Sequence, residues 1–270
     1  MKTKLIYLST LLCFGLNNAW SQDDFAFKVG EKLEYDVYYN WGVIWVNAAK
    51  TIFTVEDATF KQMPAFRLEM ATRTVKAFGL LNFNDTTTTF VNKRTLYPYF
   101  ARQASHEPDY FSIIKTTFFR NDSVRWGVHI EKERKKGISF DTITAEKAYF
   151  DILTTLYRLR NIDHSQLVEN HKIPMPMLIG DEIYDLYVRI AGRETIKLKN
   201  GKSYNCIKVK PLLAEGKLFS RGEGMTIWIS DDQNRIPLMI ESKLKIGSMK
   251  AMVNKIENNK HPITSEIKKK

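Results

Sequence analysis

The sequence predicts a mainly β protein: one large curled antiparallel sheet, barrel-like or half-barrel-like, with one principal α-helix packed on it. The first observation is that about a dozen segments alternate polar and apolar residues, with short turn sequences between them. The second is that residues 145–160 alone carry apolar residues at convincing helical spacing. A division into two β units, around residues 137–180, is the alternative architecture.

Residues 30–55 predict a β-hairpin around the turn sequence Asn40-Trp41-Gly42. Before the turn, Leu33, Tyr35, Val37 and Tyr39 alternate with polar residues. After the turn, both faces of the run are largely apolar. We therefore expect the second run to be a central strand that is covered on both sides.

The rest of the chain continues this pattern. A turn is expected across residues 56–64, and a bent strand or single helical turn at 75–81. Asn200-Gly201 is a strong hairpin turn signal. Two prolines within residues 173–178 exclude a helix and a central strand, so we expect an extended crossing segment there. Further strands are expected at residues 65–74, 86–91, 97–105, 110–119, 123–131, 183–190, 194–198, 204–209, 225–230, 235–244 and 249–253.

The predicted helix, residues 145–160, has Thr144 as its candidate N-terminal cap. Arg158 and Arg160 lie in its last turn, where the helix dipole favours cations. We expect Asp151 and Arg160 to form hydrogen bonds at the helix ends. The residues expected to cover the concave face of the sheet are Phe150, Leu153 or Ile152, and Leu156.

Residues 1–21 have the features of a cleavable secretory leader. Lys2 and Lys4 precede a short apolar run, and the small residues Ala19 and Ser21 suit cleavage before Gln22. The leucines before Cys13 argue against a lipoprotein. We expect an exported, periplasmic or envelope-associated protein, with a single domain over residues 22–256 and a polar basic tail, expected to fray, over residues 257–270.

The formal net charge is +11, and it falls to +9 once Lys2 and Lys4 leave with the leader. Residues 132–136 and 268–270 are dense basic patches, interpreted as a solvated loop and tail. For an exported protein, anionic lipid headgroups or acidic glycans are more suitable partners than nucleic acid. Cys206 has no partner cysteine in the mature chain, so no intrachain disulfide is expected, and the sequence leaves the oligomeric state open.

The mature chain lacks the fingerprints GxSxG, HExxH, CxxC, GxGxxG and the Walker loop, so we lean towards a protein that is not an enzyme and expect no cofactor. His164 and His171 are interpreted as solvated residues rather than as metal ligands. Residues 231–234 (DDQN) have the oxygen ligands that calcium prefers but lack EF-hand spacing, which favours a turn. The candidate residues lining a ligand cavity are the aromatic residues Tyr35, Trp45, Phe66 and Trp228.

Two adjacent acids in one tight turn repel each other. We therefore predict that Asp231 or Asp232 accepts a charge-assisted hydrogen bond from an arginine or from backbone N–H groups. Arg235 is the nearest candidate, and Arg158 or Arg160 is suitable if the helix packs over this hairpin. The turn is interpreted as a structural element that keeps the C-terminal hairpin in register.

Three segments resemble the DUF3108 family of exported bacterial proteins. They are the opening sequence of residues 29–37 (VGEKLEYDV), the helix sequence of residues 151–160 (DILTTLYRLR), and residues 227–232 (IWISDD) followed by Arg235-Ile236-Pro237 and a strand reaching Gly247. Ala48-Ala49 departs from the small residue and glycine expected there. The resemblance implies a mainly β fold and an envelope location. It supplies no catalytic residues, because the function of the family is uncharacterised.

The leading functional hypothesis is an envelope protein whose curled sheet holds an apolar or amphipathic ligand, such as a lipid. One alternative is a periplasmic hydrolase or glycan-processing enzyme that uses carboxylates such as Glu34, Asp36 or Asp85. Another is a structural or assembly protein that binds partners through a sheet edge. An apolar cavity would favour the first hypothesis, and a polar cleft with facing carboxylates would favour the second.

Overall fold

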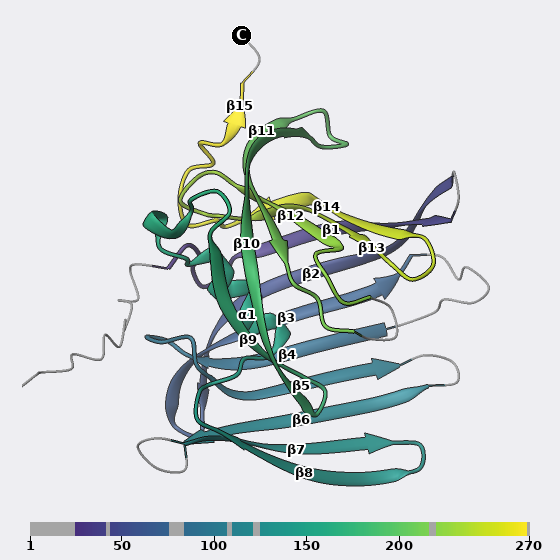
Figure 1. Cartoon of the computed structure of the whole chain (residues 1–270), viewed down its shortest axis with the longest axis vertical. Coiled ribbons are helices and arrows are strands. Elements are labelled where there is room, and N and C mark those ends of the chain that lie inside the picture. Colours follow the sequence, from purple (N-terminus) through teal and green to yellow (C-terminus); the bar gives the residue numbers. More distant parts are fainter. Residues whose placement is uncertain are drawn as a thin grey trace, which may run out of the picture.

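The computed structural model describes residues 25–41, 44–75, 84–106, 110–120, 125–215 and 220–268. It confirms the mainly β fold class, with one fifteen-stranded sheet in which each pair of neighbouring strands is antiparallel (Figure 1). The strand order is β8-β7-β6-β5-β4-β3-β2-β1-β14-β13-β12-β11-β10-β9, and β15 pairs with β11. The strands are β1 (Lys32–Trp41), β2 (Ile44–Phe60), β3 (Met63–Thr74), β4 (Asn84–Asn92), β5 (Pro98–His106), β6 (Phe111–Arg120), β7 (Trp126–Arg134), β8 (Gly137–Ala145), β9 (Lys172–Ile179), β10 (Glu182–Lys197), β11 (Ser203–Pro211), β12 (Met225–Ser230), β13 (Pro237–Lys243), β14 (Ser248–Glu257) and β15 (Glu266–Ile267).

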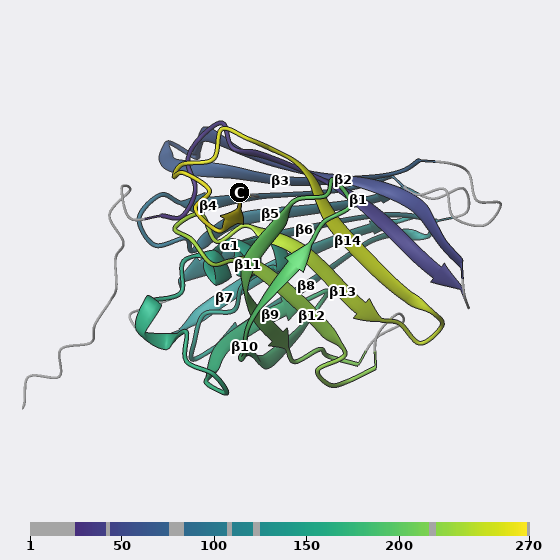
Figure 2. The ribbon, with the colours of Figure 1, turned by 90° about the horizontal axis from the view of Figure 1, so that it is seen from above.

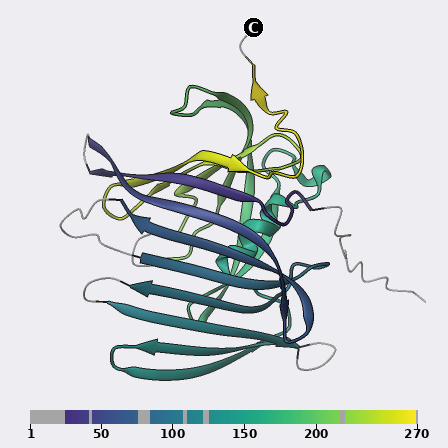
Figure 3. The same ribbon diagram turned by 180° about the vertical axis from the view of Figure 1, so that it is seen from behind.

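The sheet is curled but open, with β8 and β9 as its two ends. Strands β1 to β8 form a broad wall, which Figure 3 shows from behind. The strands from β9 to β13 cross in front of that wall, and the helix α1 (Ile152–Arg160) lies between the two parts (Figure 2). Hydrogen-bonded pairing continues from β8 to β9, so the chain does not form two separate sheets.

The turn expected across residues 56–64 is present but much shorter than that range. Strand β2 continues to Phe60, and the chain reverses at Lys61 and Gln62, whose φ angles are 48° and 69°. The acidic residues that suggested a turn are instead held by ion pairs, Glu56 with Arg67 of β3 and Asp57 with Lys93 just after β4. Arg67 on β3 lies 2.8 Å from the Glu56 carboxylate, and the two residues are directly opposite in the register. Paired opposite charges stabilise neighbouring strands, so acidic residues in this position do not end β2.

Strand β8 was missed, because the basic residues that precede it were interpreted as a loop. Strand β7 runs to Arg134, only residues 135 and 136 form the turn, and β8 pairs with β7 along its whole length. The expected strands 183–190 and 194–198 are one strand, β10, with a register shift between Ile190 and Arg193. Most of the element expected at residues 75–81 lies outside the described residues.

The helix begins at Ile152, seven residues later than expected. Asp151 caps it, and its carboxylate accepts hydrogen bonds from the backbone N–H groups of Leu153 (3.0 Å) and Thr154 (3.1 Å). Thr144 therefore is not the cap. Phe150, just before the helix, pairs with Met177 of β9 in a parallel bridge. The apolar residues there fit a helical spacing, but they are used for sheet contacts.

The main core lies between the helix and both parts of the sheet. Leu153 and Tyr157 are buried in it together with Phe25 and Phe27 from the segment before β1. Phe150 is also buried, as expected, whereas Ile152 is 47% exposed. Leu156 is partly buried at the margin of the core. One face of the helix thus packs in the core, and a second face borders a different space.

Replacing Leu153 with alanine should lower the free energy of unfolding by about 2–5 kcal/mol, because it leaves a cavity in a closely packed core. Ile152→Ala is the matched control on the same helix turn, and it should change stability by no more than about 0.5 kcal/mol. Urea unfolding followed by circular dichroism measures both variants. Equal losses in the two variants would contradict the assignment of the buried helix face.

Candidate ligand-binding cavity

An apolar cavity of about 420 Å³ lies between α1 and the strands β9 to β12. Its walls come from elements that are distant in the sequence. Its apolar lining includes Leu156 and Leu159 of α1, Met175 and Met177 of β9, and Met225 and Ile227 of β12. The adjoining core cluster includes Leu159, Met175 and Ile227, so the cavity continues from close-packed protein.

The alternation of side-chain direction along β9 explains why its methionines line the cavity. Side chains on a strand point alternately to opposite faces, so Ile173, Met175 and Met177 share the inner face. Pro174 and Pro176 lie between them, at positions where the lack of a backbone N–H costs no hydrogen bond to β10. The segment expected to be an extended crossing is therefore an edge strand, which pairs with β10 along its length.

The polar side chains at the cavity are few, and most of them have hydrogen-bond partners. Glu215 is exposed at the margin, and its carboxylate lies 2.6 Å from Lys245 Nζ and accepts from the Arg221 N–H at 2.7 Å. The hydrogen bond from Lys245 holds the pKa of Glu215 below its usual value, so the carboxylate stays charged at the rim. The Tyr187 hydroxyl donates to Glu223 at 3.1 Å. The arrangement suits an apolar group and offers no pair of facing carboxylates.

The carboxylates proposed for a hydrolase lie elsewhere. Glu34 pairs with Lys32 at 2.6 Å on β1, and Asp36 is on the same strand. Asp85 on β4 accepts a hydrogen bond from Ser105. Among the described residues, no group of three or more His, Cys, Asp and Glu side chains is placed to hold a metal ion. Within the same ranges, no helix is long and apolar enough to span a membrane.

None of the four aromatic residues selected from the sequence lines the 420 Å³ cavity. Tyr35 is buried in the core and donates to the Pro237 carbonyl at 2.7 Å; burial raises the pKa of its hydroxyl far above its usual value. Phe66 is also in the main core. Trp45 is 43% exposed on β2, and the indole N–H of Trp228 donates to Glu194. The methionine-rich sequence of β9 is the signal that could have identified the lining.

A buried ion pair lies at the C-terminal end of α1. Arg160 and Glu31 are each 1% exposed, and the guanidinium contacts both carboxylate oxygens at 2.5 and 2.9 Å. The same guanidinium donates to the backbone carbonyls of Asn234 (3.0 Å) and Ala26 (3.2 Å). It therefore joins the end of α1 to the segment before β1 and to the β12–β13 turn. The expectation of hydrogen bonds at both helix ends is confirmed.

The expected hydrogen bonds of the Asp231–Asn234 turn are confirmed, but the arginine is none of the three candidates named from the sequence. Arg193 donates to Asp231 at 2.9 Å, whereas Arg235 donates to the Ile162 carbonyl. Asp232 accepts from the Asn234 N–H at 3.0 Å and from the hydroxyl of Ser265 at 2.6 Å.

The expectation that the tail frays is wrong for the part that the structure describes. Asn234 donates to the His261 carbonyl at 2.8 Å and accepts from its N–H at 2.8 Å. The Lys202 ammonium lies 3.0 Å from Glu266 of β15, which pairs with β11. These contacts fix residues 258–267 against the β12–β13 turn and β11.

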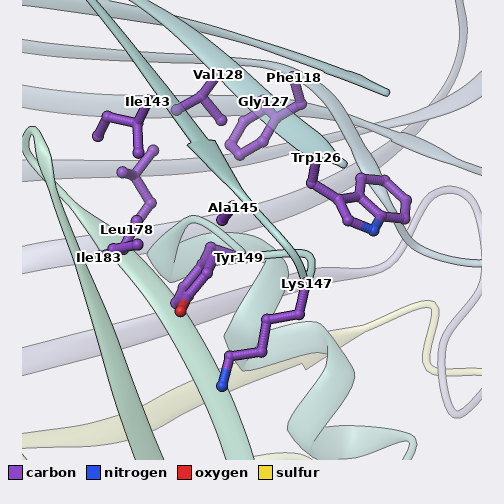
Figure 4. Close-up of a pocket in the computed structure, with 10 residues that line it drawn as sticks. All are labelled: Phe118, Trp126, Gly127, Val128, Ile143, Ala145, Lys147, Tyr149, Leu178 and Ile183. Carbon is purple, nitrogen blue, oxygen red and sulfur yellow. The ribbon is translucent and has the colours of Figure 1, made fainter. Parts of the chain in front are cut away.

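The β9–β10 hairpin also contacts the wall. Leu178 packs in a cluster with Val128 and Ile130 of β7, and Figure 4 shows it beside Ile143 in a small second pocket. At the edge of this contact, Lys132 pairs with Asp181, and Lys147 pairs with Asp185 at 2.7 Å. The hairpin therefore covers the inner face of β7 and β8 beside the larger cavity.

These features define a barrel-like β protein with an internal helix. The chain belongs to the DUF3108 family, described as proteins of unknown function, whose family model matches residues 34–254. This confirms the suspected family, although the description assigns no activity.

Two solved structures were matched to this chain. A β-barrel-like protein of the domain of unknown function DUF1849 from Brucella abortus has a TM-score of 0.54 at 9% identity, covering 85% of this chain and 98% of that chain. A Bacteroides fragilis protein with a YmcC-like fold has a TM-score of 0.32 at 10% identity, covering 88% of this chain and 99% of that chain. No curated protein matches the sequence. The likeness to the Brucella protein shows a shared fold alone.

A double-mutant cycle tests the buried ion pair. Glu31→Leu and Arg160→Met should each lower the free energy of unfolding by about 3–5 kcal/mol, because each leaves one charge buried without its partner. The double variant should be less destabilised than the sum of the two, by at least about 1 kcal/mol. Chemical unfolding measures the cycle, and strict additivity would contradict the coupling.

Replacing Asp232 with asparagine should lower the free energy of unfolding by about 1–3 kcal/mol, because Ser265 loses a carboxylate acceptor. Amide exchange in residues 258–267 should become faster, and ligand binding per folded molecule should not change. Asp231→Asn is the control, since its partly exposed ion pair with Arg193 contributes about 0–1 kcal/mol. Lost binding in an Asp232→Asn protein of unaltered melting temperature would show that the turn belongs to a site.

Proposed function

We propose that this protein is an exported, non-enzymatic envelope protein that binds an apolar or amphipathic molecule, such as a lipid, in the cavity between α1 and β9–β12. The observation that carries the proposal is the cavity itself. Its volume of about 420 Å³ is within the ~300–1,000 Å³ range of small-molecule sites. The leader expected at residues 1–21 and the family resemblance support export.

The lining favours a flexible hydrocarbon chain. Met175, Met177 and Met225 are unbranched side chains that adapt to irregular shapes, and leucines from α1 and from the segment after β11 also line the cavity. Such a wall repacks around chains of different length more readily than a wall of rigid rings. The ligand class supported best is an amphipathic molecule with one acyl chain inserted in the cavity.

The polar end of such a ligand would lie at the margin, where Glu215 and Lys245 form an exposed ion pair. Glu215 and Lys245 neutralise each other, so the margin accepts a polar group with little preference for positive or negative charge. The basic balance of the chain as a whole favours approach to anionic lipid surfaces. Affinity would come mainly from burial of the hydrocarbon chain.

Native mass spectrometry and lipid extraction of the purified protein test the proposal directly. A bound acyl lipid is the expected result. Titration with a fluorescent fatty acid then tests the location, because Leu156→Trp places a larger side chain in the cavity and should weaken binding at least tenfold.

Ile246→Trp is the matched control for that titration, because Ile246 is 71% exposed outside the cavity lining. Its dissociation constant should equal that of the wild type. Melting temperatures of both variants show whether each one is folded. Absence of any bound or titratable lipid would overturn the proposed function, and unchanged affinity in Leu156→Trp would overturn the site.

A further inference from the structure

Strand β8 forms one edge of the sheet, and its outer edge faces solvent at the bottom of Figure 1. It pairs with β7 from Gly137 to Ala145 without a register shift. Most of its residues are exposed, including Ile138 (57%) and Phe140 (77%). A long, regular edge strand with exposed apolar side chains is a template for pairing with another strand.

The two edges of the sheet differ in how they are protected. Edge β9 carries Pro174 and Pro176, and Phe150 is hydrogen-bonded to it through the Pro176 carbonyl (3.1 Å) and the Leu178 N–H (2.9 Å). Strand β8 contains no proline, lysine or arginine between residues 137 and 145. The one charged residue of β8 is Asp141, which opposes pairing with another strand. Its carboxylate accepts a hydrogen bond from the Thr142 N–H at 2.7 Å.

We propose that β8 pairs antiparallel with β8 of a second copy of this chain, so that the sheet continues across a two-fold axis. The register that fits has Phe140 opposite Phe140 of the second copy, and Asp141 opposite Ser139. Aromatic pairs across strands are stabilising. A register centred on Asp141 would instead place two carboxylates directly opposite each other, which is destabilising.

The charges at the ends of β8 match the same arrangement. Arg134, Lys135 and Lys136 are exposed where the strand begins, and Glu146 is exposed immediately after it ends. Antiparallel pairing brings the basic end of one copy beside Glu146 of the other. The two-fold axis repeats this contact, so both ends of the interface gain opposite charges.

The interface is a single pair of strands, so the expected dimer is reversible and depends on protein concentration. The apolar cavity is lined by α1 and the opposite part of the sheet, together with Gln103 of β5. Dimerisation through β8 is therefore compatible with ligand binding, and the inference does not rest on the proposed function.

Sedimentation equilibrium of the full chain tests the proposal. The wild type should show a reversible monomer–dimer equilibrium at micromolar concentrations. Phe140→Lys should raise the dimer dissociation constant at least tenfold, whereas Ile246→Lys, at another highly exposed apolar residue, should leave it unchanged. Asp141→Ser should lower the dimer dissociation constant, because this substitution releases the Thr142 N–H and removes the charge that opposes strand pairing.

Cross-linking locates the interface independently. With Cys13 replaced by serine, Phe140→Cys should give covalent dimers with a short bismaleimide, whereas Ile246→Cys should not. Cys206 is unreactive under these conditions because it is 1% exposed and burial raises the pKa of its thiol to about 12. A monomeric wild type at high micromolar concentration would overturn the proposal. So would a dimer unaffected by Phe140→Lys, or one that Phe140→Cys does not cross-link.

Discussion

The buried contact between Arg160 and Glu31 is the constraint on which the rest of the structure depends. A charge taken out of water is costly unless its partner and its remaining hydrogen bonds are supplied. The Arg160 guanidinium meets that requirement with one carboxylate and two backbone carbonyls, those of Asn234 and Ala26. These groups belong to the segment before β1 and the β12–β13 turn, so the ion pair forms only when distant parts of the chain are assembled around the helix end.

Fixing the helix end determines where the cavity lies. With Arg160 held, Leu153 and Tyr157 face the main core, and Leu156 is directed towards the strands β9 to β12. Those strands cross the wall rather than lie flat on it (Figure 2). A short helix cannot fill the space between two surfaces that cross, so the side facing β9 retains an apolar volume. The cavity thus follows from the architecture and from the side chains that line it.

Local sequence signals predicted most of the strands, the Asn200-Gly201 turn, the presence of one helix and the hydrogen bonds of Asp232. They failed where a long-range partner decides the structure. Glu56 is in a strand because Arg67 lies opposite, and Phe150 pairs with β9 although its spacing is helical. Tyr35 and Phe66 were assigned to a cavity because alternation identifies an inner face but not which part of that face is close-packed. The arginine partner of Asp231 depends on the register of β10, which turn chemistry alone does not determine.

The path of the chain explains why the sheet stays open. Closing it would require β8 and β9 to pair, and the isolated bridge between Phe150, five residues after β8, and Met177 of β9 is parallel. Asp151 begins the helix immediately after this bridge, so the parallel ladder ends there. The backbone groups of residues 176 and 178 face Phe150, and in a strand residue 174 faces the same side. Pro174 and Pro176 therefore present no N–H groups at that edge, which protects β9 and leaves β8 as the edge at which the sheet can still be extended.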